Sequence, residues 1–286
     1  MLFSSTDVKQ CFEWYHMPSN WSRKHTKDEI IPHFLSKLTE GTKYVEKHFK
    51  SELNVPYGES EREKIDLFYT GDIAEEDLDG LPIFVYIHGG NWQEGDRSYY
   101  HGIAKPYLNK RCIVAIFGYD LSSDVHKIPS IEQQCVKGFQ FLINRYPKSR
   151  FILSGHSAGA YLVTSLMSFP DVVLRIKGII SISGIFQLDD FSLTSVASAI
   201  DKSDLPSQNL LLRNYNEITK IEIKLFVGND ESPIFHYQSM KMYEKLSRKS
   251  TYVSLEIVPD EDHFSIIEKM MDESSSITQF VFKLLE

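Results

Sequence analysis

The feature that most constrains the fold is a repeated alternation of short apolar runs with segments of helical periodicity. Two of these runs, 83–87 and 178–182, are apolar almost throughout, as strands buried on both faces of a sheet are. Most runs are separated by enough chain to hold a crossover helix, which predicts a mostly parallel, twisted sheet with helices on both faces. The predicted strands are 64–69, 83–88, 112–119, 151–154, 176–183, 221–227 and 253–258.

Two segments flank or interrupt this pattern within a single predicted domain, 1–286. Residues 1–60 are predicted to form a helix-containing N-terminal arm, because the run Ile30, Ile31, Phe34, Leu35 and Leu38 follows a helical period. Residues 187–216 lie between two predicted strands and carry an irregular helical pattern. We expect this insertion to cover the strand ends as a partial lid.

Composition excludes several classes of partner. The chain has 39 acidic and 31 basic residues, a net charge of −8, which argues against nucleic-acid binding. The short basic cluster of Arg23, Lys24, His25 and Lys27 is interpreted as a solvated face. Three cysteines do not resemble a disulfide framework, and neither a secretory signal nor an apolar run of 18 residues is visible. These features favour a cytoplasmic protein with no membrane span.

The segment after the predicted strand 151–154 carries the first sign of chemistry. It reads Gly155-His156-Ser157-Ala158-Gly159 and leads into an apolar helical pattern, the strand–turn–helix context of a nucleophile elbow. The two glycines keep Cβ atoms out of a turn that is too tight for them. The hydroxyl of Ser157 should therefore project above the sheet, and we expect Ser157 to be a nucleophile.

A glycine-rich turn follows another buried strand, 83–88. It reads His88-Gly89-Gly90-Asn91-Trp92. Glycines leave backbone N–H groups free to point into a site, so the amides of Gly89 and Gly90, with that of Ala158, are candidates for an oxyanion hole. His88 is expected to be a structural hydrogen-bonding residue at the strand end, not a base.

A serine hydroxyl needs a base that a third group orients. In hydrolases with a nucleophile elbow, the triad residues occur along the chain in the order serine, acid, histidine. An acid and then a histidine should therefore follow later strands. The segment 228–233, after the predicted strand 221–227, holds both Asp230 and Glu231. His263 follows the last predicted strand and is the histidine in the right place. Either carboxylate could orient the imidazole.

With these residues in place, the chain resembles the kynurenine formamidase (arylformamidase) family of α/β hydrolases, near the hormone-sensitive-lipase-like esterases. The HGGxW element is the most specific part of the likeness. The residues that carry the resemblance are Met17-Pro18-Ser19-Asn20-Trp21, His88-Gly89-Gly90-Asn91-Trp92-Gln93, Gly155-His156-Ser157-Ala158-Gly159-Ala160, Ser183-Gly184-Ile185-Phe186, Ser232-Pro233-Ile234-Phe235 and Asp262-His263-Phe264.

One departure from the family pattern concerns the acid. Family members resemble Gly-x-x-Asp-Ser-Pro there, whereas this chain has Glu231 before Ser232 and Pro233, with Asp230 one residue earlier. Ungapped register therefore favours Glu231, and glutamate serves as the triad acid in some α/β hydrolases. Asp230 stays the alternative.

The resemblance implies an α/β-hydrolase fold and hydrolysis of N-formyl-L-kynurenine to L-kynurenine and formate in tryptophan catabolism. It implies a Ser157–His263–acid triad, a formyl-enzyme, a small-molecule substrate and no metal or organic cofactor. Trp92 and Asn91 are candidate substrate contacts, with Trp92 either an aromatic wall or a side chain packed beneath its loop. A homodimer is left open.

Two other functions share the same residues. A broad-specificity carboxylesterase would use the same catalytic groups, and activity on short p-nitrophenyl esters without activity on N-formylkynurenine would favour it. A non-catalytic ligand-binding protein on the same fold is the alternative from another class, because fold does not determine function. Failure of a serine-directed probe to label Ser157 would favour that alternative.

Overall fold

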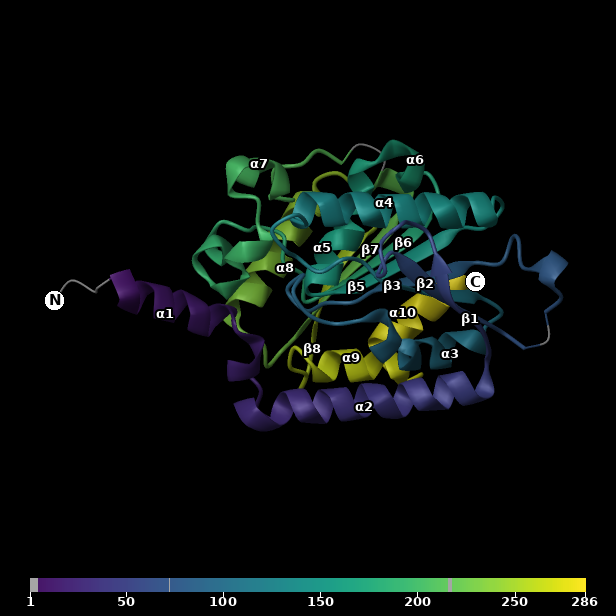
Figure 1. Cartoon of the computed structure of the whole chain (residues 1–286), viewed down its shortest axis with the longest axis horizontal. Helices are drawn as coiled ribbons and strands as arrows, with labels where there is room; N and C mark the ends of the chain where they lie inside the picture. The colour runs from purple at the N-terminus through teal and green to yellow at the C-terminus, as the bar shows by residue number, and fades with distance from the viewer. Residues whose placement is uncertain (1–4, 72, 216–217) are drawn as a thin grey trace.

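The computed structural model describes residues 5–71, 73–215 and 218–286 and has an eight-stranded sheet at its centre (Figure 1). The strands lie in the order β1-β2-β4-β3-β5-β6-β7-β8, with β1, β2 and β4 paired antiparallel and the remaining pairs parallel. The strands are β1 (Lys50–Pro56), β2 (Lys64–Tyr69), β3 (Ile83–Ile87), β4 (Ile113–Phe117), β5 (Phe151–His156), β6 (Ile176–Ile182), β7 (Glu222–Gly228) and β8 (Val253–Val258).

Helices cover both faces of the sheet, as predicted, and the fold is that of an α/β hydrolase. In Figure 1, α4 and α5 lie above the sheet, and α2, α3, α9 and α10 lie below it. The helices are α1 (Ser5–His16), α2 (Lys27–His48), α3 (Lys105–Leu108), α4 (Ile128–Arg145), α5 (Ala158–Ser165), α6 (Pro170–Val173), α7 (Leu205–Gln208), α8 (Pro233–Ser247), α9 (Ser265–Glu268) and α10 (Ser276–Leu285). No helix within the described residues has the length and apolar character that crossing a bilayer requires.

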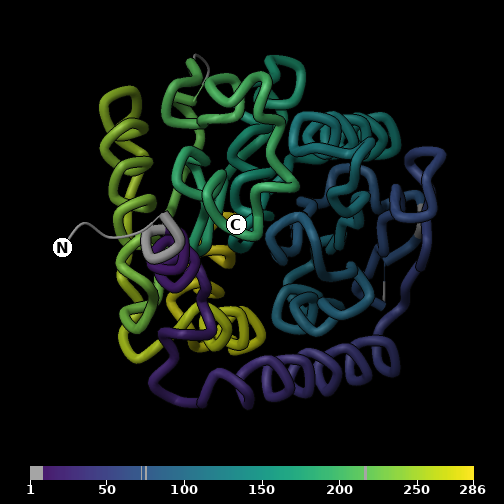
Figure 2. Tube along the Cα trace, turned by 60° about the vertical axis from the view of Figure 1, so that its left-hand side comes forward, coloured from purple at the N-terminus to yellow at the C-terminus, as the bar shows by residue number. Residues whose placement is uncertain are grey.

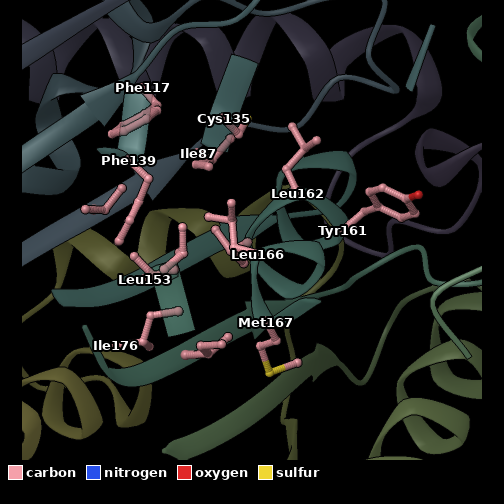
Figure 3. Close-up of a cluster of buried hydrophobic side chains, with 14 of the residues drawn as sticks. Ile87, Phe117, Cys135, Phe139, Leu153, Tyr161, Leu162, Leu166, Met167 and Ile176 are labelled. Atoms are coloured by element: carbon pink, nitrogen blue, oxygen red, sulfur yellow. The ribbon is translucent and has the colours of Figure 1, made fainter. Parts of the chain in front are cut away.

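Strand alternation divides the core into two clusters. On β3, Val85 and Ile87 belong to the cluster beneath α4 and α5, whereas Phe84 and Tyr86 belong to the one that meets α2 and α10. All five residues of β3 are buried, which explains its uninterrupted apolar sequence. Figure 3 shows part of the first cluster, with Leu162 of α5 above the sheet.

The predicted strands are all present, but the extent of the arm needs a correction. Residues 50–56, which we assigned to the arm, form the edge strand β1. Its side chains are largely exposed, and the register with β2 shifts between Glu52 and Val55, where Asn54 has a φ of 62°. This irregularity removes the period-two apolar pattern from which a strand is predicted.

The remaining part of the arm lies against the body of the molecule. Helix α2 begins at a capping box formed by Thr26 and Glu29. Of the five predicted periodic residues it buries three, whereas two are exposed; the buried ones are Ile30, Phe34 and Leu38, and the exposed ones are Ile31 and Leu35. Figure 2 shows α2 along one side of the molecule, and in Figure 1 α1 extends away from the body. The arm therefore forms one wall of the molecule at the edge where the parallel strands end.

The insertion predicted as a lid lies between β6 and β7. It contains α7 and three short 3-10 helices, Asp190–Leu193, Ser195–Ala199 and Lys202–Asp204. Gln93, in the loop after β3, donates a 2.7 Å hydrogen bond to Ser198 and a 3.1 Å one to the carbonyl of Ser195. The last residue of the predicted insertion, 216, lies outside the described residues.

Candidate active site

Ser157 stands between β5 and α5 in a conformation that few residues adopt. Its φ is 55° and its ψ is −117°, which places strain at a single residue. A Cβ atom at Gly155 would lie 2.2 Å from the carbonyl oxygen of Gly159, and one at Gly159 would lie 2.1 Å from that of Ile87. Both glycines are therefore required by close backbone contacts, and the turn has the geometry predicted for a nucleophile elbow.

The loop after β3 lies directly beside this turn. A Cβ atom at Gly89 would come within 2.8 Å of the carbonyl oxygen of His156 and 3.1 Å of the Cβ of Ser157. Within the described residues, the amides of Gly89, Gly90 and Ala158 have no backbone partner. These three donors lie on the two turns that the structure brings together, so they are available to an oxygen atom bound at Ser157.

The histidines of the two turns are held neutral by burial. Burial lowers the pKa of His88 to about 4, and its Nδ1 lies 2.8 Å from the carbonyl oxygen of Gly89. Burial, together with the neighbouring His263, lowers the pKa of His156 well below its usual value. His88 therefore serves the loop structurally, as expected, and neither residue adds a charge next to Ser157 near neutral pH.

The structure separates the two candidate acids. Oε2 of Glu231 lies 2.6 Å from Nδ1 of His263, and Oε1 accepts hydrogen bonds from the amide of Gly228, at 2.7 Å, and the hydroxyl of Ser183, at 2.5 Å. Asp230 instead forms an ion pair with Arg23, at 3.2 Å. Of the two carboxylates left open by the sequence, Glu231 is the one that contacts His263.

The side chain of His263 contacts aromatic rings as well as the carboxylate of Glu231. It is 4% exposed, and its ring centroid lies 4.4 Å from those of His156 and Phe235. With Nδ1 occupied by Glu231, Nε2 is the nitrogen left for the pocket. Ser157 and His263 line the same cavity.

This cavity has a volume of about 490 Å³ and lies between the strand ends and the arm. Ser157 and His263 line it together with the loop after β3. The arm, including α2, supplies mostly apolar lining residues, and Ser195 comes from the insertion. The lining residues are Met17, Pro18, Ser19, Ile31, Phe34, Leu35, Gly90, Asn91, Gln93, Glu94, Gly95, Tyr99, Tyr100, His156, Ser157, Ser195, His263 and Phe264.

The two tentative substrate contacts have different positions. Asn91 lines the cavity, with a φ of 53°. Trp92 is fully buried beneath the loop, edge-on to Tyr161 at a centroid distance of 5.3 Å, and is absent from the lining. Of the two roles left open for Trp92, the structure therefore matches the side chain packed beneath its loop and not the aromatic wall. Aromatic surface comes instead from other residues, namely Phe34, Tyr99, Tyr100 and Phe264.

Phe34, Tyr99 and Tyr100 were missed because no motif marks them, whereas Phe264 belongs to the Asp262-His263-Phe264 motif. Phe34 was predicted only as a helix residue, and nothing in the sequence shows that α2 would face the strand ends. Met17, Pro18 and Ser19 did have a signal, since they belong to the arm motif on which the family resemblance partly rests.

The basic cluster of the arm is largely exposed, as predicted, and it also forms ion pairs with the loops after β7 and β8. Arg23, whose side chain is 76% exposed, pairs with Asp230, and Lys24 pairs with Glu261 at 2.8 Å. Ser22 donates a 2.6 Å hydrogen bond to Asp262. The arm thus contacts both loops that supply the groups beside Ser157.

Comparison with known proteins agrees with this architecture. A family model described as BD-FAE matches residues 71–241. The chain is 30% identical to a kynurenine formamidase of Danio rerio (97% of this chain and 96% of the relative) and 31% identical to one of Salmo salar (94% and 93%). A kynurenine formamidase of Drosophila melanogaster is 27% identical, over 94% of each chain.

Solved structures share the fold at lower identity. A Silicibacter protein described as a thioesterase superposes with a TM-score of 0.78 at 23% identity, over 94% of this chain and 97% of its own. An esterase from the bacterial hormone-sensitive lipase family gives a TM-score of 0.69 at 16% identity, over 100% of both chains. These likenesses support the α/β-hydrolase fold that the sheet and elbow predict.

Proposed function

The chain belongs to the kynurenine formamidase family of hydrolases, and from this premise we propose that it converts N-formyl-L-kynurenine to L-kynurenine and formate. The observation that carries the proposal is the placement of Ser157 and His263 on one cavity, with Glu231 buried behind the histidine. This arrangement supplies a nucleophile, a base and an acid that orients the base.

The first half of the reaction forms a formyl-enzyme. His263 accepts the hydroxyl proton of Ser157 at Nε2 while the serine Oγ attacks the formyl carbon. The carbonyl oxygen becomes negatively charged, and the amides of Gly89, Gly90 and Ala158 are the donors for it. When the C–N bond breaks, His263 returns the proton to the departing aniline nitrogen, and the free arylamine leaves.

The second half uses water as the nucleophile. His263 removes a proton from water, whose oxygen attacks the formyl carbon of the ester on Ser157. Collapse of this intermediate breaks the ester bond, returns the proton to Oγ and releases formate. Glu231 holds Nδ1 throughout and stabilises the imidazolium that forms in each half.

The cavity fits the leaving group better than the acyl group. A formyl group is the smallest acyl group, so recognition depends on the arylamine side. Phe34, Tyr100 and Phe264 offer aromatic faces for the ring of the substrate. Ser19, Asn91, Gln93 and Ser195 offer polar groups for its amino-acid end.

The direct test is absorbance-monitored turnover of N-formyl-L-kynurenine by the purified protein. We expect rapid deformylation that Ser157→Ala abolishes while the circular dichroism spectrum is unchanged. A short-chain p-nitrophenyl ester serves as the comparison. Hydrolysis of the ester with none of the formamide would contradict the proposal and assign the protein to general esterases.

A serine-directed fluorophosphonate separates both hydrolases from a binding protein. Labelling of the wild-type protein, with none of Ser157→Ala, is expected if Ser157 is activated. An unlabelled wild-type protein that still binds N-formylkynurenine would contradict catalysis through this serine.

A further inference from the structure

The permanently charged side chains that line the cavity are acidic only. Among the described residues that line it, Glu94 is the only acidic side chain, and neither lysine nor arginine is present. The lining histidine His156 is neutral, because burial keeps its pKa well below the usual value. A ligand in this cavity therefore meets a carboxylate and no permanently cationic side chain.

Glu94 is held at a fixed place beside the reacting groups. Its amide donates a 2.9 Å hydrogen bond to the carbonyl of Gly90. Gly90 has a φ of 110°, and a Cβ atom there would lie 2.3 Å from the carbonyl oxygen of Glu94 and 3.3 Å from its Cβ. The backbone of Glu94 thus packs against the loop that carries two of the oxyanion donors.

Two cations that contact this loop, Arg62 from the segment before β2 and Arg97 from the loop itself, already have other partners. Arg62 pairs with Asp96 at 3.2 Å and donates to the carbonyl of Gly95 at 2.5 Å. Arg97 pairs with Asp66 at 3.1 Å. No ion pair of Glu94 occurs within residues 5–71, 73–215 and 218–286.

Tyrosines next to Glu94 add a second cation-binding element. Tyr99 and Tyr100 both line the cavity. Glu94 lines the same cavity, so its carboxylate and the two phenol rings are presented to one ligand. A carboxylate beside aromatic rings is a favourable environment for an ammonium group.

We propose that Glu94 selects aryl formamides whose side chain carries a protonated primary amine, and that a carboxylate on that side chain is dispensable. This inference rests on the proposed function and extends it to 2-formamidophenyl ketones that have the amine alone. The ammonium of N-formylkynurenine meets Glu94, an exposed residue of the lining, and the substrate carboxylate lies on the side away from it. A side chain with only a carboxylate is repelled.

Four substrates that differ in charge test the proposal: the zwitterion N-formylkynurenine, its decarboxylated amine, its deaminated acid and neutral formanilide. We expect kcat/KM for the amine to equal or exceed that of the zwitterion, and the acid to be the poorest of the three ketones. Glu94→Gln should lower kcat/KM for the amine about fivefold more than it lowers kcat/KM for formanilide, the scale of an ion pair near a surface.

Charge reversal provides the sharpest comparison. Glu94→Lys should favour the acid over the amine, whereas Glu40→Gln, which removes an exposed carboxylate from α2, should keep the wild-type order. An unchanged order of the amine and the acid in Glu94→Lys, or a wild-type preference for the acid, would overturn the proposal.

A binding measurement separates this inference from the proposed reaction. Titration calorimetry of Ser157→Ala with the two deformylated products, the amine and the acid, reports the charge preference without turnover. We expect tighter binding of the amine, lost in Ser157→Ala/Glu94→Gln. Equal affinities would refute the role of Glu94 even if deformylation is observed, and an amine preference without deformylation would refute only the proposed reaction.

Discussion

Oε2 of Glu231 lies 2.6 Å from Nδ1 of His263, while the adjacent Asp230 pairs with Arg23 of the arm. The two neighbouring carboxylates therefore have different partners. Glu231 is 5% exposed and also accepts bonds from Ser183 and Gly228, so its orientation is fixed from three sides. The length of the glutamate side chain allows it to reach His263 from the position where the family pattern has aspartate.

The first prediction separates these two acids. Glu231→Gln should lower kcat for N-formylkynurenine by about 10³–10⁴-fold, because an amide cannot stabilise the imidazolium and favours the wrong tautomer. Asp230→Asn should change kcat by no more than about threefold, because Asp230 does not contact His263 and its partner Arg23 is 76% exposed, so the ion pair contributes little. Steady-state kinetics on both variants is the measurement. A larger loss in Asp230→Asn than in Glu231→Gln would reverse the assignment.

The sequence predicted most of the sheet because its parallel strands are buried on both faces. It missed β1, whose exposed side chains and irregular register at Asn54 remove the apolar alternation. It predicted Ser157 and His263 by chain order, but it could not choose between Asp230 and Glu231. That choice depends on how the loop after β7 turns.

The residues that form the walls of the cavity could not be predicted from local sequence patterns either. The contact of Arg23 with Asp230 joins residues that are far apart in the chain, and neither has a local pattern that indicates the other. Trp92 belongs to a motif, but the sequence does not indicate which way its side chain points. Its burial is set by packing against Tyr161. Local motifs thus located the candidate triad residues, whereas the surfaces that enclose them depend on tertiary packing.

The second prediction concerns the elbow. Gly159→Ala should destabilise the protein by at least about 1–3 kcal/mol, because the new methyl group would lie 2.1 Å from the carbonyl oxygen of Ile87. Gly71→Ala is the control, since a Cβ atom there meets nothing within 4 Å. Urea unfolding followed by circular dichroism measures both. Equal midpoints for the two variants would contradict the close contact.

The third prediction concerns the arm. Burial alone would raise the pKa of Asp262, but hydrogen bonds from Ser22 and from the amides of Ser265 and Phe264 lower it overall. Ser22→Ala removes the 2.6 Å bond to this buried carboxylate and should cost about 1–3 kcal/mol. We also expect kcat to fall several-fold, because Asp262 directly precedes His263.

An exposed pair of the same kind is the control for Ser22. Ser274 donates a 2.8 Å hydrogen bond to Asp272 on the surface, and Ser274→Ala should alter neither the unfolding midpoint nor kcat. If both alanine variants have wild-type stability and turnover, the arm does not hold the loop that carries His263.

The fourth prediction is the direction of the pH dependence of stability. The pKa of His88 is about 4 in the folded protein, because of burial, and near 6.5 in the unfolded chain. Between these values the unfolded chain binds a proton that the folded protein does not, so the stability falls as the pH decreases from 6.5 to about 4. This residue alone should contribute about 3 kcal/mol of that loss.

Urea unfolding at several pH values should show the decrease, and His88→Gln, which has no titrating group, should make it smaller. An equal decrease in the variant would mean that other buried groups, such as His156, cause it.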